Sequence, residues 1–168
     1  ENDAEHGVVQ LRNVQRNSIE VTLKEWTYLD GNHAEEDISL LVVPQGRQTL
    51  TDGTVIEAGT FVTTDHAEVN FIESFAAAPK VFLTIQSANG SPKIVRPTTV
   101  GIDRLAVAMR GEEASSVVTA ETVGYLAILS AGETITTTVN GSDTTIDLAQ
   151  ISLDDNWTKQ LPGMAHLE

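Results

Sequence analysis

The sequence contains no cysteine, which excludes disulfide bonds, thiolate metal sites and cysteine nucleophiles. It is also poor in aromatic residues, at 5%, and has only 10 basic residues against 24 acidic ones. The resulting net charge of -14 argues against binding to nucleic acid or to an anionic membrane, because both require a basic surface. The acidity is explained by solubility, for example in a salty environment, or by a calcium-rich or cationic partner.

Long hydrophobic runs and helical patterns are absent as well. No apolar run approaches the roughly 18 residues that a membrane span needs, and no signal-peptide pattern is present. Residues 67–78, the best helical candidate, lack the sustained apolar spacing of an amphipathic helix. Because the chain begins at Glu1 rather than with methionine, we expect a processed or excised piece of a longer protein.

The patterns that are present are typical of β-strands. Ile19, Val21 and Leu23 alternate with polar residues, which is the period-two pattern of a half-buried strand. Continuously apolar runs at residues 38–43 and 118–129 predict strands covered on both faces, and residues 80–86 predict another strand. Turn dipeptides punctuate the chain: Asp30-Gly31, Asp52-Gly53, Ala58-Gly59, Asn89-Gly90, Ala131-Gly132 and Asn140-Gly141.

The chain also contains an imperfect copy of itself. Residues 8–14 and 18–25 return as residues 94–100 and 104–111, and residues 36–43 return as residues 121–128. A repeat of this kind sets the architecture, and together with the many short strands it predicts an all-β fold of antiparallel sandwiches.

The copies divide the chain into three units. We expect the C-terminal part of one repeat in residues 1–62, a complete repeat in residues 63–132 and the start of a further repeat in residues 133–166. Half a sandwich leaves an apolar face and open sheet edges. The first and last units are therefore expected to complete each other or to pair with another chain.

The complete copy resembles the H-type lectin domain family. The residues that match are Val69-Asn70-Phe71, Phe75, Pro79 to Ile85, Leu105-Ala106-Val107 and Val123 to Ile128, with Tyr125 where the family has a tryptophan. The resemblance implies an antiparallel sandwich that is usually trimeric, in a family first known from agglutinins that bind N-acetylgalactosamine.

The first copy alone contains a loop with aromatic, acidic and histidine side chains. By the resemblance, Trp26 falls where the lectins place a tryptophan at their sugar site, while Thr27 replaces a histidine. Trp26 and Tyr28 lie two residues apart, so on an extended segment their rings would face one side and could stack on a pyranose. Asp30 and His33 would then hydrogen-bond to its hydroxyls. The alternative is that both rings cap the open end of a sandwich core.

Other patterns in and beyond this loop favour structural roles. Residues 30–33 predict a turn in which Gly31 adopts a positive φ. The functional alternative is a Ca²⁺ site formed by Asp30, Glu35 and Glu36 with a backbone carbonyl. The four histidines lack the spacing of known zinc sites.

The pair Glu112-Glu113 predicts a solvated loop. A glycosidase would need two carboxylates facing one cleft, whereas adjacent strand residues point to opposite faces.

The resemblance, together with the aromatic loop of the first copy, implies a non-catalytic, extracellular carbohydrate-binding module without a cofactor. Its ligand would be a polysaccharide or glycan, its parent a larger secreted polysaccharide-degrading or adhesive protein, and its assembly a homo-oligomer, a trimer by the resemblance. The alternative is a structural or oligomerisation module that binds no sugar. A glycoside hydrolase or lyase is less favoured, because no acid/base constellation is identifiable.

Overall fold

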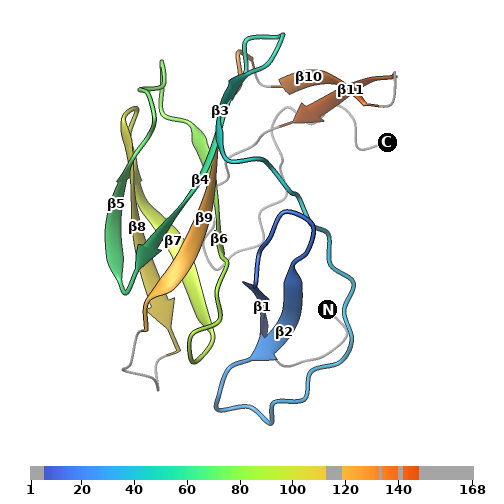
Figure 1. Cartoon of the computed structure of the whole chain (residues 1–168), viewed down its shortest axis with the longest axis vertical. Coiled ribbons are helices and arrows are strands. Elements are labelled where there is room, and N and C mark those ends of the chain that lie inside the picture. Colours follow the sequence, from blue (N-terminus) through green and yellow to red (C-terminus); the bar gives the residue numbers. More distant parts are fainter. Residues whose placement is uncertain (1–5, 113–118, 133, 140–141, 148–168) are drawn as a thin grey trace, which may run out of the picture.

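The computed structural model describes residues 6–112, 119–132, 134–139 and 142–147, which form an all-β structure without helices (Figure 1). The strands are β1 (Gly7–Arg12), β2 (Glu20–Glu25), β3 (Gly46–Thr49), β4 (Val55–Thr63), β5 (His66–Asn70), β6 (Lys80–Ile85), β7 (Lys93–Val100), β8 (Arg104–Gly111), β9 (Glu121–Leu129), β10 (Thr134–Val139) and β11 (Ser142–Asp147). This part of the chain thus offers no helix that could cross a membrane.

Two antiparallel sheets form a sandwich, with strand orders β3-β4-β9-β6 and β5-β8-β7. The predicted all-β antiparallel sandwich is confirmed. Strand β9 is central, because it pairs with β4 along nine residues on one side and with β6 on the other. Its continuous apolar sequence follows from this position, since a central strand inside a sandwich is largely covered by protein.

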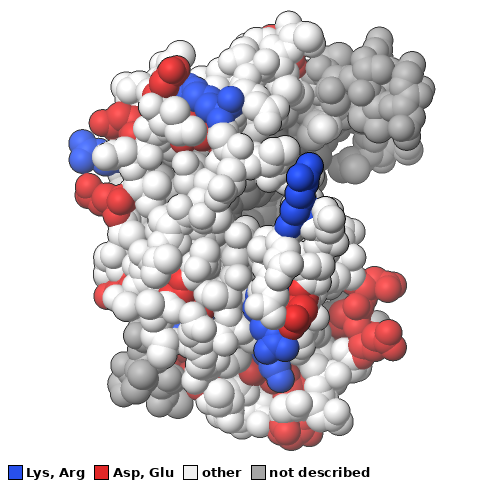
Figure 2. Space-filling model, in the orientation of Figure 1, with Lys and Arg blue, Asp and Glu red and all other residues white. Residues whose placement is uncertain are grey.

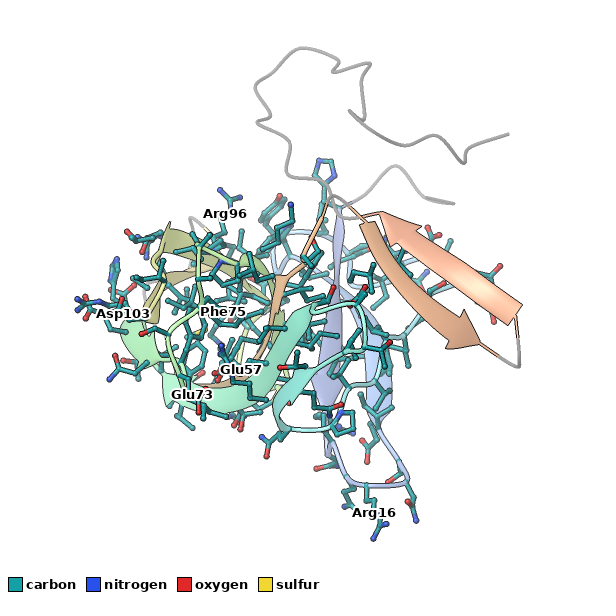
Figure 3. The ribbon with its side chains drawn as sticks, turned by 90° about the horizontal axis from the view of Figure 1, so that it is seen from above. Arg16, Glu57, Glu73, Phe75, Arg96 and Asp103 are labelled. Atoms are coloured by element: carbon teal, nitrogen blue, oxygen red, sulfur yellow. The ribbon has the colours of Figure 1, made fainter. Side chains whose placement is uncertain are left out.

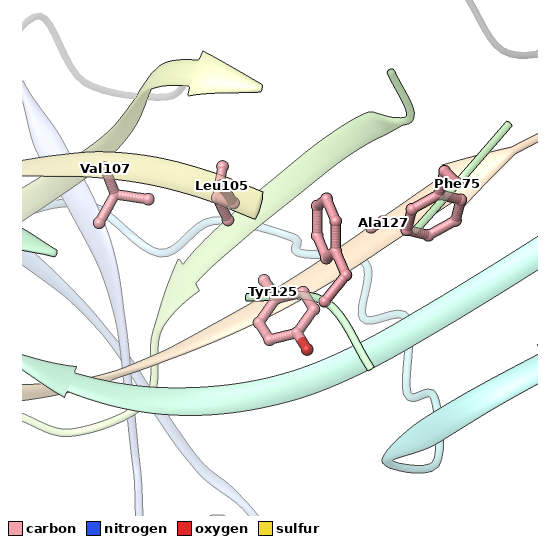
Figure 4. Close-up of a cluster of buried hydrophobic side chains, with 6 residues drawn as sticks. Phe75, Leu105, Val107, Tyr125 and Ala127 are labelled. Carbon is pink, nitrogen blue, oxygen red and sulfur yellow. The ribbon is translucent and has the colours of Figure 1, made fainter. Parts of the chain in front are cut away.

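The core lies between these two sheets (Figure 4). Its buried members are Phe71, Phe75, Leu105, Val107, Tyr125 and Ala127. The period-two pattern of β8 places Leu105, Val107 and Met109 on the inner face, where each is at most 1% exposed. Full burial of such a side chain stabilises the fold by about 1.5–3 kcal/mol.

A buried carboxylate organises one end of the core. Glu57 on β4 is fully buried and accepts hydrogen bonds from Tyr125 Oη (2.9 Å), Arg47 Nη1 (2.8 Å) and the backbone N–H of Ile72 (2.9 Å). The guanidinium of Arg47 also lies over the Phe75 ring, and Figure 3 shows Glu57 and Phe75 inside the sandwich. Desolvation, followed by the hydrogen bond to Glu57, raises the pKa of Tyr125 to about 12.

One predicted turn is wrong. The dipeptide Ala58-Gly59 lies within β4 and pairs with β9. The glycine is needed for packing instead, because a Cβ at Gly59 would lie 2.6 Å from Cε1 of Tyr125. Gly31, Gly53 and Gly90 do adopt positive φ values, whereas Asn140-Gly141 lies outside the described residues.

The internal copy is visible in the strand register. Strands β1 and β2 pair from Gly7↔Glu25 to Leu11↔Val21, and β7 and β8 pair from Lys93↔Gly111 to Pro97↔Val107. Each partner in the second hairpin lies 86 residues after its counterpart in the first. The hairpins diverge only beyond this point, where β7 contains an irregularity between Pro97 and Thr99.

The strand predicted at residues 38–43 is wrong. These residues form no strand, although they are the copy of the central strand β9. Ile38, Leu40 and Val42 are 44%, 50% and 82% exposed, whereas their counterparts Val123, Tyr125 and Ala127 are 0%, 8% and 0% exposed. A strand exists only with a partner, and among the described residues no strand pairs with this segment in a sheet.

The unit boundaries expected from the copies differ from the limits of the sandwich. Residue 63, the expected start of the complete repeat, is the last residue of β4, so β3 and β4 from the first unit belong to the central sandwich. The hairpins β1–β2 and β10–β11 lie on the same side of it as separate two-stranded sheets (Figure 1). Among the described residues no sheet joins them, and residues 148–166 lie outside that range.

Candidate functional site

The predicted binding loop begins with a tight turn directly after β2. The backbone N–H of Leu29 donates to the carbonyl of Trp26 (3.0 Å), so the expectation of an extended segment is wrong. Trp26 is half-buried, but the Tyr28 side chain is 63% exposed. Tyr28 therefore caps no core, and its ring is presented to solvent.

Glu112 explains why the chain turns here. It follows β8, is only 7% exposed and accepts hydrogen bonds from both the backbone N–H (2.7 Å) and the hydroxyl of Thr27. The solvated loop predicted for Glu112-Glu113 is thus wrong for Glu112, whereas Glu113 lies outside the described residues. Hydrogen bonds to a carboxylate are stronger than neutral ones, so Glu112 fixes the first copy's loop to the sandwich.

The second half of the loop is held by two further carboxylates. Glu25, the last residue of β2, accepts the N–H of Gly31 (2.8 Å), and Asp30 Oδ1 accepts the N–H of Asn32 (2.9 Å). Gly31 has φ +80°, which confirms the predicted turn. His33 is half-buried, and its Nδ1 lies 2.9 Å from the Ala34 carbonyl, which requires a proton on Nδ1.

The four predicted site residues therefore share one loop of fixed backbone, but they differ in exposure. Tyr28 and Asp30 are exposed, whereas Trp26 and His33 are half-buried. Beneath the loop Glu25 is 6% exposed, and its Oε1 is a buried acceptor that no described donor reaches. An aromatic face and several carboxylate oxygens can accommodate a polyhydroxylated ligand, through ring stacking and acceptance of hydroxyl protons.

Sequence reasoning missed Glu25 and Glu112. Both are glutamates at strand ends, a pattern that usually indicates solvated charge. Their partners are backbone N–H groups and a hydroxyl, and Thr27 lies 85 residues from Glu112. The copy offset makes Glu112 the equivalent of Trp26, which gives no sign of a contact between the copies, so no sequence pattern points to this anchor.

The calcium alternative finds no support in the described part of the chain. No group of three or more histidine or acidic side chains there could hold a metal ion. The nearest candidate, Asp30, uses Oδ1 to stabilise its own turn. Figure 2 does show acidic side chains along the side of the molecule where the segment after β2 runs.

The fold and the loop define an all-β sandwich module with an exposed, carboxylate-rich loop. Comparison with known proteins finds a partial similarity to a much longer protein. Halomucin of Haloquadratum walsbyi (strain DSM 16790 / HBSQ001) is 29% identical over 135 residues, which cover 75% of this chain. The match spans 2% of the length of that relative. No family model matches the chain, and no solved structure matches it.

Proposed function

We propose that the chain is a non-catalytic, extracellular carbohydrate-binding module that uses the loop after β2. The observation that carries the proposal is the Tyr28 side chain, 63% exposed on a turn that Glu112 fixes to the sandwich. Because the backbone of this turn is fixed, ligand binding orders little of the chain beyond the Tyr28 side chain itself.

The polar groups around the ring suit sugar hydroxyls. Asp30 is exposed beside Tyr28 in the sequence, and the half-buried Trp26 precedes both. The proposed role of His33 is secondary, because its Nδ1 is directed to the backbone of Ala34.

The length of the relative supports the idea of a module within a larger protein. Halomucin is about fifty times longer than the matched segment, and the chain itself contains parts of more than one repeat. Weak single sites become effective when many copies act together. We therefore propose a repeated binding or adhesive unit of a large secreted protein, acting as an oligomer.

Retention on glycan arrays and on insoluble polysaccharide tests the proposal. Tyr28→Ala should weaken binding roughly tenfold, since stacking of this size is worth about 1.4 kcal/mol. Tyr28→Phe is the matched control, because it keeps the ring and loses only the hydroxyl. Binding that is unchanged in Tyr28→Ala would remove the proposed site, and absence of any glycan ligand for the wild type would remove the function.

The second candidate is a structural or assembly module without sugar binding. It is favoured by the exposed apolar segment at residues 38–43, which includes Leu41 at 78% and Val42 at 82% exposure. An obligate oligomer with no glycan ligand would support this alternative. A hydrolase or lyase is less favoured, because Glu112 is engaged by Thr27 and is not directed at a cleft.

A further inference from the structure

The apolar residues exposed at 38–43 have buried counterparts in the same chain. Ile38, Leu40 and Val42 correspond to Val123, Tyr125 and Ala127, three of the inward-facing residues of β9. Beside them, the inward positions of β2, Val21 and Leu23, are only half-buried. With Val9 and Ile38 they line a shallow hollow on the first copy.

The second copy shows what covers such a face. There the residues equivalent to Val21 and Leu23 are Val107 and Met109, each 1% exposed beneath the sheet that contains β9. That sheet is assembled when β4 pairs with β9, from Val55↔Leu129 to Thr63↔Glu121. Strand β6 pairs with the other edge of β9. Among the described residues, residues 38–43 have neither pairing, and a hairpin of the β3–β4 type would supply the one that β4 makes.

The chain contains a second hairpin of that type. Strands β10 and β11 follow β9 as β3 and β4 follow residues 38–43, and each hairpin directly succeeds one copy of the repeat. Strand β11 pairs with β10 on one edge, and among the described residues no strand covers its other edge. Strand β4 uses that same outer edge to bind β9.

We propose that the β10–β11 hairpin of one copy of this chain docks on residues 38–43 of a second copy, in the way that β3–β4 binds β9. Each chain then carries one donor hairpin and one acceptor segment, so the contact is heterologous. Contacts of this kind form a ring where the rotation closes and an open chain where it does not. In a tandem array of repeats the same contact joins neighbouring units.

Backbone geometry identifies the groups involved. In an antiparallel ladder the N–H groups of successive residues point alternately to the partner and to the outer edge. The pair Val139↔Ser142 closes the β10–β11 hairpin, so the N–H groups of Asp143, Thr145 and Asp147 point to the outer edge. Thr145→Pro removes one of these outward donors and leaves the bonds to β10 intact.

Sedimentation equilibrium of the full chain, from micromolar to near-millimolar concentration, tests the proposal. The average mass should rise above that of the monomer, and more so at high salt, because a net charge of -14 opposes self-association until it is screened. Val42→Asp, which places a charge on the acceptor face, and Thr145→Pro should each weaken association about tenfold or more. Ile72→Asp is the control, since Ile72 is 61% exposed on the sandwich.

Two results would overturn the proposal. One is a chain that stays monomeric at every concentration and salt level. The other is association that persists unchanged in both Val42→Asp and Thr145→Pro. Strong hydrogen-exchange protection of residues 38–43 in the dilute monomer would instead identify the chain's own β10–β11 hairpin as the occupant, and would equally exclude a second copy.

Discussion

The same apolar sequence pattern occurs twice in this molecule and adopts a different structure each time. The copy at β9 is the central strand of a four-stranded sheet, whereas the copy at residues 38–43 forms no strand and exposes its apolar side chains. The hairpins before them keep one register, from Gly7↔Glu25 and from Lys93↔Gly111. Local sequence therefore suffices for the hairpin, and the central strand depends on partners from elsewhere in the sequence.

Charge placement distinguishes the copies further. In the second copy Glu121 is buried and binds Lys93 Nζ (2.8 Å), Ser87 Oγ (2.5 Å) and the N–H of Asn89 (3.0 Å). Both partners of the ion pair are only 3% exposed. In the first copy the position of Lys93 is occupied by Gly7, so this pair has no counterpart. A buried ion pair of this kind can form only where the sandwich is complete and excludes water.

The largest effect is expected from breaking that ion pair. Lys93→Met leaves Glu121 as a buried, uncompensated charge and should lower the free energy of unfolding by about 3–5 kcal/mol. The double variant Lys93→Met/Glu121→Leu should recover much of this loss. Chemical denaturation measures both, and equal stability of the single variant and the wild type would show that the pair is not buried in solution.

The next largest effect is a difference in stability loss between the copies when equivalent apolar side chains are truncated. Met109→Ala leaves a cavity in the core and should cost about 2–5 kcal/mol. Leu23→Ala, at the matching position of the first copy, should cost under about 1 kcal/mol, because Leu23 is already partly hydrated. The comparison fails if denaturation gives the two variants similar losses in the monomer.

The contact between the copies should have a smaller, local effect. Glu112→Gln removes the charge that holds Thr27, and hydrogen bonds to charged groups are worth about 1.5–3 kcal/mol. The Thr27 amide should then exchange roughly tenfold to a hundredfold faster, as measured by NMR hydrogen exchange. Glu73→Gln, at a side chain that is 77% exposed, is the control and should change nothing. An unchanged exchange rate of the Thr27 amide in Glu112→Gln would show that Glu112 does not hold the loop.

The smallest effect is expected from pH. The pKa of Tyr125 is raised from 10.0 to about 12 in the folded protein. The folded state therefore holds this proton more tightly than the unfolded state, so its stabilising contribution is complete below pH 10 and is lost as the pH rises to about 12. Denaturation at successive pH values should show this loss, and Tyr125→Phe should abolish it. An identical loss in Tyr125→Phe would assign it to another group.

The fold class could be predicted because it depends on local periodicity. The alternation of Ile19, Val21 and Leu23, and its copy in β8, is a property of each segment alone. The strand at residues 38–43 could not be assessed in this way, because pairing depends on residues distant in sequence. The turn predicted at Ala58-Gly59 was wrong for a related reason, because Gly59 makes room for the Tyr125 ring of another strand.

The candidate site was predictable only in outline. The sequence indicates an exposed aromatic loop with a turn at Gly31, and the structure confirms the turn. It gives no sign that Trp26 would be half-buried while Tyr28 is exposed, because that difference follows from the turn closed between Trp26 and Leu29. The anchoring role of Glu112 likewise depends on the packing of the first copy against the second.

The central claim is that residues 38–43 are an unpaired copy of β9, and amide hydrogen exchange of the dilute monomer tests it most directly. Amides in β9 should be protected close to the level of global unfolding, whereas those of residues 38–43 should exchange nearly as fast as an unstructured peptide. Protection of residues 38–43 equal to that of β9 would show that the first copy is already complete, and would contradict the account.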